Sequence, residues 1–477
     1  MRVCIIAEGC YPYAVGGVSG WNNSMIKAFP NVEFIVMAIV SDRSQRGKFK
    51  LELPENVTAV YETYLNDYDW EKKSGKSRKI KLNAVQRTAL RNLILNNDID
   101  WDTLFDLFQN YKFSVDDLLM GEDFLDAVKE VYEAKYPLIV FSDFLWTMRS
   151  IYLPFFLILK TKLPKANIYH CVATGYAGVL GGMAKYKDEC GLLVSEHGIY
   201  TREREEEIIK ASWVSGVYKD IWIDQFRKMS RLAYDKADKV TALYNHAREL
   251  QIENGCNPDK SVVISNGIYI DRFANAEGKS EKEIEEGVIN VGAILRVAPI
   301  KDVKTLISAF AYAKEKVPKL HLWIIGPQDE ESEYAEECIG MVSQLRLNDV
   351  HFTGTVDTRD YIGRMDFTIL TSISEGQPLT ILEGFAAGKP AISTDVGNCR
   401  DMIYGTDDDF GQAGIVTHIM NIEEIAEAMV ELAMNREERE KMGEAGKKRV
   451  NALYDVNTMR AKYSALYDEI YDETFES

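Results

Sequence analysis

Short apolar segments rich in β-branched residues alternate with helical segments along most of this chain, in two separate series. The first series comprises "RVCIIAEG", "VEFIVMAIV", "NIYHCVA", "GLLVSEH", "KADKVTALY" and "SVVISNG". The second comprises "VINVGAILRV", "LHLWIIGP", "VHFTGTV", "DFTILTS" and "PAIST". Strands separated in this way by helices form parallel sheets with helices on both faces. The sequence therefore predicts an α/β fold of two Rossmann-like, doubly wound domains facing each other across a cleft.

The domain limits follow from changes in composition. The stretch "ANAEGKSEKEIEEG" (274–287) has the character of a linker, which places an N-terminal domain at 1–275 and a C-terminal domain at 286–455. At about 43–136 the alternation gives way to charged and aromatic text with helical spacing, which predicts a helical insertion in the N-terminal domain. The insertion is either a partner surface or a solvated helical cap, and we favour the cap. The last helical stretch, 456–477, fits either domain.

Charge and cysteine content limit the partners and the compartment. The formal net charge of −18 argues against nucleic acid as a partner and, more weakly, against an anionic membrane surface. The seven cysteines show no paired metal spacing, and their odd number suits a reducing compartment such as the cytoplasm. The apolar run at the start is too short for a signal peptide, and "IYLPFFLILK" is too short to span a bilayer. We therefore expect a soluble cytoplasmic protein that reaches a membrane only through partners.

The stretch "SEGQPLTILEGFAAGKP" places two carboxylates, Glu375 and Glu383, around the start of a predicted helix. Pro378 is tolerated in the first helical turn and Gly388 ends the pattern, so the helix is expected at about 378–387. In parallel sheets, ligands bind beyond the carboxyl ends of the strands, and free N–H groups at a helix start favour an anion. A carboxylate would repel that anion, so each is better suited to accept hydrogen bonds from neutral hydroxyls. A phosphate flanked by hydroxyls describes a sugar nucleotide.

Two cations occur beyond the first strand of the second series, in "GAILRVAPIKDVKTLISAF". Asp302 is a suitable N-cap for the helix that follows, which leaves Arg296 and Lys301 in the loop above the strand end. A guanidinium and an ammonium together are the pair expected for a diphosphate bound without a metal ion. Each cation alone would be read as an ordinary solvated side chain, but the nearby helix start favours a binding role for both.

The N-terminal domain offers weaker candidates at the ends of its strands. Gly16 and Gly17 in "AVGGVSGW" would let a ligand approach the backbone, although a plain tight turn has the same sequence and no GxGxxG fingerprint is present. His170 and His197 each end a strand, where a histidine is more often a structural hydrogen-bonding group. Arg204 belongs to "REREEE", which is equally well a solvated first helical turn.

Other sites of known chemistry are missing from the sequence. It contains no zinc-like Cys/His spacing, no convincing DxD pair and no nucleophile elbow. The acidic stretch "TDDDF" (406–410) is expected to be an exposed loop. We therefore predict no metal site.

Taken together, these motifs resemble the retaining glycosyltransferases of family 4, which have the two Rossmann-like domains of the GT-B fold. The Glu375 and Glu383 pair matches that family's signature of two glutamates separated by seven residues, and "SNGIYIDRF", "GAILRVAPIKD", "IIGP" and "ISTDVG" follow in the expected order. The segments "EGCYPYAVGGVSGW", "HCVATGYAGVLG" and "SEHGIYTRERE" are similar to glycosyltransferases of Pel-type exopolysaccharide biosynthesis. The resemblance covers nearly the whole chain outside about 43–136.

The resemblance implies a role for each candidate residue. Glu383 would bind the ribose hydroxyls of uridine diphosphate, and Glu375 would bind a hydroxyl of the donor sugar. Arg296 and Lys301 would neutralise the leaving diphosphate in place of a metal ion, while His197 would lie near the anomeric centre or the primary hydroxyl. The remaining ligand-binding candidates are Gly16, Gly17, His170, Arg204, Val356, Gly376, Gln377, Pro378, Leu379 and Thr380. The closing helix at 456–477 would return to the N-terminal domain.

The activity implied is retaining, metal-independent transfer of a hexose from a UDP-sugar, either UDP-glucose or a UDP-N-acetylhexosamine, to the saccharide acceptor of a growing biofilm exopolysaccharide. The donor is a substrate and no separate cofactor is expected; inner-membrane Pel synthase subunits are the expected protein partners. Two alternatives stay open. In the first, the chain is a catalytically silent UDP-sugar-binding subunit of a membrane polysaccharide synthase. In the second, it is a UDP-sugar epimerase.

Overall fold

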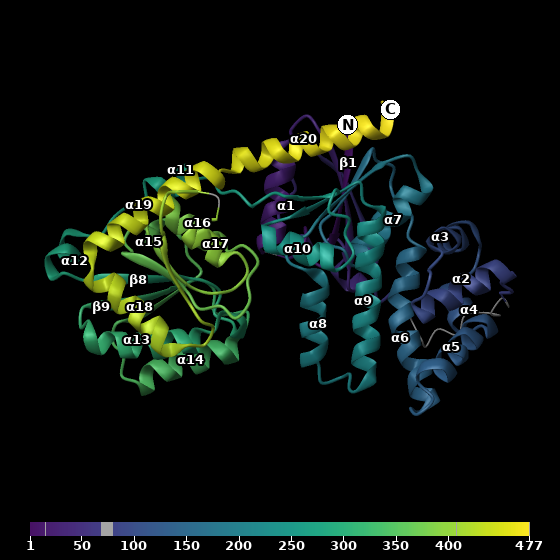
Figure 1. Cartoon of the computed structure of the whole chain (residues 1–477), viewed down its shortest axis with the longest axis horizontal. Helices are drawn as coiled ribbons and strands as arrows, with labels where there is room; N and C mark the ends of the chain where they lie inside the picture. The colour runs from purple at the N-terminus through teal and green to yellow at the C-terminus, as the bar shows by residue number, and fades with distance from the viewer. Residues whose placement is uncertain (15, 68–79, 407, 477) are drawn as a thin grey trace. The chain divides into compact units, whose positions relative to one another are not determined.

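The computed structural model describes residues 1–14, 16–67, 80–406 and 408–476 (Figure 1). The chain divides into two compact units. Unit 1 comprises Met1–Val263 together with Tyr463–Ser477, and unit 2 comprises Ile264–Lys462. This division falls earlier than the linker that the composition suggested at 274–287.

Unit 1 is built on a seven-stranded sheet in which every neighbouring pair of strands is parallel. The strands are β1 (Arg2–Glu8), β2 (Glu33–Val40), β3 (Val57–Tyr64), β4 (Ile168–Cys171), β5 (Gly191–Ser195), β6 (Lys239–Ala242) and β7 (Ser261–Val263). Their order is β3-β2-β1-β4-β5-β6-β7, so the chain winds in one direction from β1 and in the other from β4. In register, Ile5 lies between Val36 and His170. The carboxyl ends of β1 and β4 are thus the switch point at which such sheets bind ligands.

The helices of unit 1 include the predicted insertion. They are α1 (Gly17–Ala28), α2 (Ala84–Leu95), α3 (Trp101–Asn110), α4 (Val115–Leu119), α5 (Glu122–Lys135), α6 (Phe141–Leu159), α7 (Tyr176–Lys187), α8 (Tyr200–Lys210), α9 (Val217–Lys236) and α10 (Asn245–Glu253), with a 3-10 turn, η1, at Arg43–Gln45. One part of the range 43–136 is not helical, because Val57–Tyr64 forms the edge strand β3. Its alternating, β-branched sequence "VTAVYETY" explains the difference. Positions 68–79 of the predicted insertion lie outside the described residues.

The insertion shares one core with the sheet of unit 1. Leu93 of α2 and Phe105 of α3 belong to the same buried apolar cluster as Leu192 of β5. The ammonium of Lys228 on α9 is also buried there, where it donates to the carbonyl of Leu93 (2.6 Å) and to the hydroxyl of Tyr152 (3.0 Å) on α6. A buried cation needs such partners, so these bonds fasten the insertion to the body of the unit.

Unit 2 is built on a six-stranded, fully parallel sheet of order β10-β9-β8-β11-β12-β13. The strands are β8 (Ile289–Ile294), β9 (Leu320–Ile325), β10 (Val350–Gly354), β11 (Phe367–Leu370), β12 (Ala391–Thr394) and β13 (Gly414–Thr417). The helices are α11 (Asp271–Ala274), α12 (Glu281–Glu286), α13 (Val303–Lys316), α14 (Ser332–Gln344), α15 (Arg359–Ile362), α16 (Leu379–Ala386), α17 (Cys399–Tyr404), α18 (Ile422–Met434) and α19 (Arg436–Leu453), with a 3-10 turn, η2, at Pro299–Lys301. Of the strands described in unit 2, β13 is the one that the sequence analysis did not anticipate.

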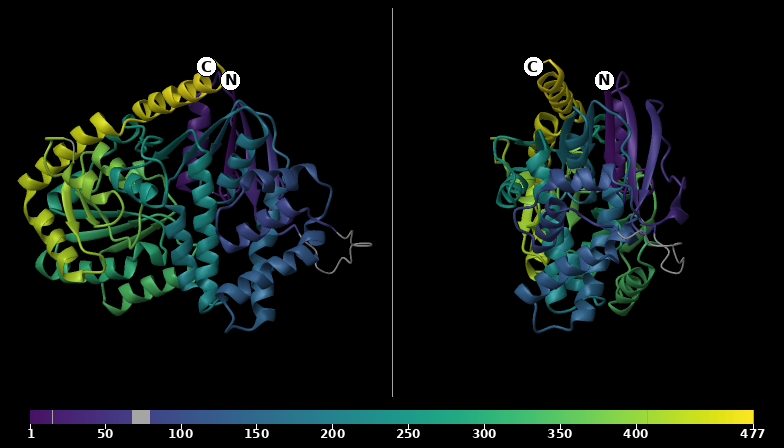
Figure 2. Two further views of the ribbon diagram at one scale, coloured as in Figure 1. Left: turned by 45° about the vertical axis from the view of Figure 1, so that its right-hand side comes forward. Right: turned by 90° about the vertical axis from the view of Figure 1, so that its right-hand side faces the viewer.

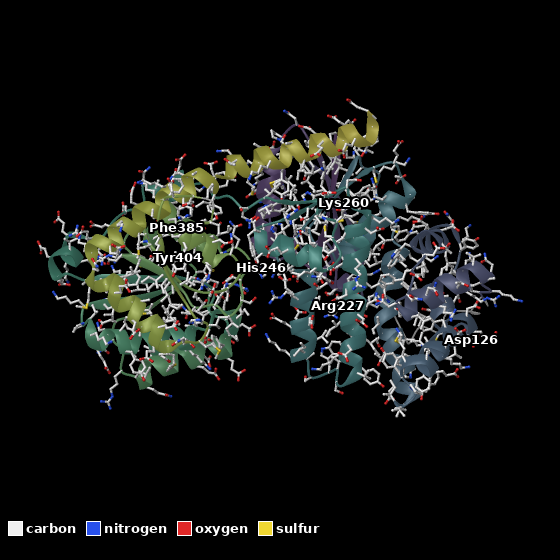
Figure 3. The ribbon with its side chains drawn as sticks, in the orientation of Figure 1. Asp126, Arg227, His246, Lys260, Phe385 and Tyr404 are labelled. Carbon is white, nitrogen blue, oxygen red and sulfur yellow. The ribbon has the colours of Figure 1, made fainter. Side chains whose placement is uncertain are left out.

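Two apolar clusters fill unit 2. One joins α13 and α18 to the sheet through residues such as Phe310 and Met429, and the other joins α16, α17 and α19 to it. Phe385 of α16, labelled in Figure 3 beside Tyr404 of α17, is fully buried in the second cluster. A Cβ on Gly446 of α19 would lie 2.6 Å from the Phe385 ring, so α19 packs closely over α16. This packing fixes the helix that carries Glu383.

The segment predicted as a linker is bound to unit 2. Lys279 forms an ion pair with Asp366 (2.5 Å), and Glu283 of α12 forms one with Arg364 (2.9 Å). The final helix, α20 (Val456–Phe475), is a single continuous helix, drawn in yellow in Figures 1 and 2. Its residues up to Lys462 belong to unit 2, and those from Tyr463 belong to unit 1. Among the helices of the described residues, none is both long enough and apolar enough to cross a membrane.

Candidate functional site in unit 2

The first segment of the site is the loop between β8 and α13. A Cβ on Gly326 would lie 2.0 Å from the carbonyl oxygen of Leu295, so the glycine of the predicted "IIGP" motif lets the two loops meet. The loop ends at Asp302, whose side chain caps α13 by accepting from the Thr305 N–H (3.4 Å), as the sequence predicts. This geometry places Arg296 and Lys301 beyond the carboxyl end of β8.

The two cations of this loop have different environments. The Lys301 side chain is largely buried and its ammonium donates to Oε1 of Glu375 (2.5 Å). The Arg296 side chain is exposed and pairs with Glu330 at the surface. Unit 2 therefore brings Lys301 and Glu375 into direct contact, whereas Arg296 lies on the same loop without contacting either of them.

The second segment of the site is the turn from β11 into α16. Helix α16 begins at Leu379 behind Pro378, which provides no side-chain cap, and its first turn contains no acidic residue. The N–H groups at the start of a helix lack intrahelical acceptors, so those of Leu379 and Thr380 remain available to an anion. In the preceding turn, the Gln377 side chain accepts from the Asn266 N–H (2.8 Å), while no residue that the structure describes contacts its buried Nε2.

Glu383 is the least compensated carboxylate of the site. It lies one turn into α16, and within the described residues no hydrogen-bond or ion-pair partner contacts it. Burial raises the pKa of Glu383 to about 7, because the charged form is deprived of water. A half-buried carboxylate without protein donors is well suited to bind ligand hydroxyls.

The floor of the turn is made by a glycine. Gly397 has a left-handed backbone (φ +53°), and a Cβ there would lie 2.3 Å from the carbonyl oxygens of Glu375 and Gly376. The Asn398 N–H also donates to the Gly376 carbonyl (2.8 Å). Val356, which follows β10, is half-buried and packs against the same apolar cluster as Leu379. Unit 2 thus gathers the candidates from 375 to 383 on one turn and one helix.

In unit 1 the glycines lead into α1. Gly16 and Gly17 are exposed, and a Cβ at either position would meet nothing within 4 Å. The protein itself therefore does not require glycine there. The open space is compatible with close approach of a ligand.

His170 has the features of a structural histidine. It is fully buried, and its two ring nitrogens contact the hydroxyls of Tyr467 (2.7 Å) and Ser195 (2.7 Å). Burial, with the nearby His197, lowers its pKa to about 3, so it is neutral. Both ring nitrogens are used inside unit 1, and we therefore leave His170 out of the proposed ligand site.

His197 remains available for binding. Its ring packs edge-on against Trp21 with centroids 4.4 Å apart, and burial lowers its pKa to about 4. The buried Nε2 of His197 has no partner among the described residues, and neither has the indole N–H of Trp21. A neutral imidazole with a free nitrogen can exchange a hydrogen bond with a hydroxyl.

Arg204 lies on α8, and only part of its guanidinium is engaged by contacts with the protein. It forms an ion pair with Glu207 (2.6 Å), and its guanidinium lies over the Tyr200 ring, 5.6 Å from the centroid. Its buried Nε has no partner among the described residues. The Tyr200 hydroxyl in turn donates to Glu8 (3.0 Å), which ends β1 and has its pKa raised by burial. Glu8 was not recognised in the sequence, although its place at the end of β1 is a signal.

Comparison with known proteins assigns both parts of the chain. Residues 1–259 match a family described as a domain of unknown function, DUF3492, and this match covers more than half of the chain. The chain belongs to this family. Beyond the DUF3492 domain, residues 274–449 match the family described as glycosyl transferases group 1. The group 1 domain includes all the candidate residues of unit 2.

The chain is also similar to a curated protein and to solved structures. It is 30% identical over 171 residues to a putative glycosyltransferase, EpsD, of Bacillus subtilis, covering 35% of this chain and 43% of that protein. Sucrose-phosphate synthase of Thermosynechococcus elongatus has a TM-score of 0.62 at 14% identity, covering 99% of both chains. HepE of Anabaena, solved in complex with UDP, has a TM-score of 0.63 at 15% identity, covering 98% of this chain and 100% of that chain.

These similarities confirm the fold class but differ in extent. The sheets of the DUF3492 domain and of the group 1 domain are those of the predicted GT-B fold, and the solved structures share that fold over nearly the whole chain. The chain spans only 43 to 65% of the length of the curated relatives that it matches. Its own activity is therefore treated as a proposal.

Two sequence interpretations of the group 1 domain are revised by the structure. The stretch "TDDDF", expected to be an exposed loop, contains Asp408, whose side chain is buried in an ion pair with Arg449 (2.7 Å); Asp407 lies outside the described residues. Ser372 is the last residue of the strand segment "DFTILTS" and was not among the candidate residues. It donates to Glu375, a contact that the sequence interpretation missed, although its spacing three residues before a glutamate is visible in the sequence.

Proposed function

We propose that this chain is a retaining glycosyltransferase that moves a hexose from a UDP-sugar to a saccharide acceptor. The observation that carries the proposal is the carboxylate of Glu383, which is half-buried one turn into α16 and has no donor among the described residues. A ribose diol would supply the two donors that it lacks, and the free N–H groups at the start of the same helix would bind the phosphates. Uridine is chosen as the base because HepE, a protein of the same fold, was solved with UDP.

The charges of the site suit departure of a diphosphate. Breaking the bond between the anomeric carbon and the phosphate oxygen develops negative charge on the diphosphate and positive charge on the sugar. The ammonium of Lys301, the guanidinium of Arg296 and the start of α16 would stabilise the negative charge. Because these groups supply the positive charge, we propose a metal-independent reaction. Glu375 would accept a hydroxyl of the donor sugar and so fix its orientation.

Retention is proposed from the chemistry that these residues allow. The acceptor hydroxyl would attack the anomeric carbon on the face from which the diphosphate departs. Its oxygen forms the new bond, and its proton passes to the phosphate oxygen that leaves. No enzyme nucleophile is needed for this path. In unit 1, the free nitrogen of His197 and the open space at Gly16 and Gly17 would serve the saccharide, with Arg204 as a further candidate.

The biological setting is a finer proposal. The motifs of the N-terminal half resemble PelF, the cytosolic glycosyltransferase of the Pel exopolysaccharide machinery, and EpsD and a capsular polysaccharide glycosyltransferase, CapM of Staphylococcus aureus, are among the curated proteins that the chain matches. We therefore propose a cytoplasmic enzyme of exopolysaccharide synthesis that inner-membrane subunits recruit. A silent UDP-sugar-binding subunit and a UDP-sugar epimerase are the competing functions.

The test begins with a thermal-shift screen of UDP and of UDP-glucose, UDP-galactose, UDP-N-acetylglucosamine and UDP-N-acetylgalactosamine. The sugar nucleotide with the largest shift is then incubated with the chain, with and without saccharide acceptors, and UDP release is measured. Acceptor-dependent release with an α-linked product supports the transferase. Binding without release indicates the silent subunit, and conversion of the donor to its epimer, seen by NMR, indicates the epimerase. The Lys301→Ala variant should release UDP at least tenfold more slowly while keeping its fold.

A further inference from the structure

Two adjacent hydroxyl residues at the end of β11 join the two segments of the donor site. Thr371 and Ser372 are both fully buried. The Thr371 hydroxyl donates to the carbonyls of Lys301 (3.0 Å) and Asp302 (3.3 Å), and the Ser372 hydroxyl donates to Oε1 of Glu375 (2.5 Å). One residue thus holds the backbone that carries the cation, and the next holds the carboxylate.

The contacts on Glu375 are uneven. Both of its protein donors, the Ser372 hydroxyl and the Lys301 ammonium, bind the same oxygen, Oε1. Within the described residues no donor contacts Oε2. A carboxylate held in this way has one oxygen occupied by the protein and one left to accept from a ligand. Its orientation is fixed before any ligand arrives, which reduces the entropy cost of binding.

The carbonyl of Ser372 is also held in place. It accepts from the hydroxyl of Thr394 on the neighbouring strand β12 (2.6 Å), and the next N–H, of Ile373, donates to the Ile300 carbonyl (2.9 Å). These bonds fix the main chain at the strand end, so the backbone cannot move the Ser372 side chain away from Glu375 without breaking them. Ser372 therefore offers its hydroxyl to Glu375 from a fixed backbone position, unlike a serine on a mobile surface loop.

We propose that Ser372 is a positioning residue for donor-sugar recognition, and that Thr371 positions Lys301 for the diphosphate. Ser372 acts through Glu375, by directing Oε2 toward one hydroxyl of the hexose. The inference rests on the proposed function and adds a substrate property to it. The hexose of the donor must carry a free hydroxyl at the ring position that faces Oε2 of Glu375, because this hydroxyl donates to Oε2. A UDP-sugar that is deoxygenated or fluorinated at that position should be discriminated against.

The test compares UDP with UDP-sugars in the full-length chain by calorimetry and by turnover. Ser372→Ala should bind UDP within about twofold of the wild-type chain, yet bind and turn over the preferred UDP-sugar about tenfold to a hundredfold less well, as expected for loss of a hydrogen bond to a charged group. Ser372→Cys introduces a weaker donor of similar size, so its affinity and turnover for the UDP-sugar should lie between those of the wild-type chain and those of Ser372→Ala. Thr371→Val should instead weaken UDP and the UDP-sugar alike, because it acts on the diphosphate side.

Two controls separate positioning from folding. Ser393→Ala removes an equally buried hydroxyl on β12 that donates to the Thr394 carbonyl (3.1 Å), and it should leave UDP-sugar affinity unchanged. Deoxyfluoro analogues of UDP-glucose provide the second control. The wild-type chain should discriminate against one analogue, and Ser372→Ala should lose that discrimination.

Three outcomes would overturn the inference. In the first, Ser372→Ala equals the wild-type chain. In the second, it loses UDP and UDP-sugar affinity by the same factor. In the third, it keeps the discrimination between analogues. Each of these leaves the proposed function standing, provided the wild-type chain binds and turns over a UDP-sugar. If the wild-type chain binds none of the four UDP-sugars, the proposed function fails, and the positioning role of Ser372 fails with it.

Discussion

At the scale of single residues, the cost of keeping Glu383 ready for a ligand can be measured. Burial holds its pKa at about 7, above the value of 4.5 that it has when exposed. The folded chain therefore binds this proton more tightly than the unfolded chain does. Between pH 4.5 and 7 the contribution of the group to stability falls as the pH rises, and above pH 7 the ionised, unpaired carboxylate is a net cost.

Replacing Glu383 by Gln should separate stability from binding. At about 1.4 kcal/mol per pKa unit, Glu383→Gln should raise the free energy of unfolding of the ligand-free chain at pH 8 by about 1 to 3 kcal/mol, and by much less at pH 5. UDP affinity should fall at least tenfold, because an amide accepts from the ribose hydroxyls less strongly than a carboxylate. Urea denaturation at the two pH values and calorimetry with UDP measure both effects.

The matched control is Glu427→Gln on the exposed face of α18, which should change neither quantity. In the wild-type chain, UDP affinity should also rise with pH through about 7 as Glu383 ionises. An unfolding free energy of Glu383→Gln that follows the wild-type value at both pH values would contradict the assigned burial cost, and unchanged UDP affinity would contradict the ribose role.

At the scale of elements, the site depends on close approach between loops that end different strands. Gly326 brings the loop after β9 onto Leu295, and Gly397 brings the loop after β12 onto the turn at 375–376. Both glycines have backbone carbonyls where a Cβ would otherwise stand, so a side chain at either position must displace the neighbouring loop. The spacing of α16 from its neighbours is set in the same way by Gly446, against Phe385.

We expect Gly397→Ala to weaken UDP-sugar binding at least tenfold, since the turn carrying Glu375 has to move away from the new Cβ. Gly388→Ala is a matched control. Its backbone is also left-handed (φ +70°), but a Cβ there would meet nothing within 4 Å. The control should cost about 1 kcal/mol of stability through backbone strain and leave affinity intact. Calorimetry with equal affinities for both variants would show that the turn does not depend on Gly397.

At the scale of the whole molecule, each unit has apolar clusters of its own. The main cluster of unit 1 runs from Cys4 to Cys256, and those of unit 2 lie between Ile268 and Tyr454. Helix α20 contributes residues to both units, so neither is complete without the end of the chain. The proposed UDP-binding residues all lie in unit 2. Binding energy should therefore stabilise one unit in particular.

Differential scanning calorimetry of the full chain should resolve two unfolding transitions, and UDP should raise the midpoint of one of them. At a UDP concentration of about 100 times the Kd, the stabilisation of that unit should be about 2.7 kcal/mol. Limited proteolysis near the midpoints identifies which unit unfolds in each transition. The Glu383→Ala variant should lose most of this shift. Equal shifts of both midpoints in the wild-type chain would show that UDP binding is not confined to unit 2.

The sequence by itself determined most of the strands, and it pointed to the residues that the group 1 domain gathers on one turn and one helix. The predicted bounds of the strands and of helix α16 agree with the observed ones within a few residues, and the predicted cap at Asp302 is present. These predictions succeed because hydrophobic periodicity, helix capping and the effects of glycine and proline depend on residues that are close in the sequence. Local patterns misjudged the segments whose neighbours are distant. These were the strand β3 within the helical insertion and the segment 274–287, which its ion pairs bind to unit 2.

Only the tertiary structure decided which polar groups are already satisfied. In the sequence, His170 and His197 each end a strand, so both are equally good candidates for a ligand contact. Yet Tyr467, 297 residues further along the chain, occupies a ring nitrogen of His170, whereas the Nε2 of His197 has no partner in the described part of the chain. Likewise, the pairing of Lys301 with Glu375 spans 74 residues, and it reveals Ser372 as a second donor on the same oxygen. Such contacts depend on how the strands and helices pack in three dimensions, and no local pattern of residue types encodes them.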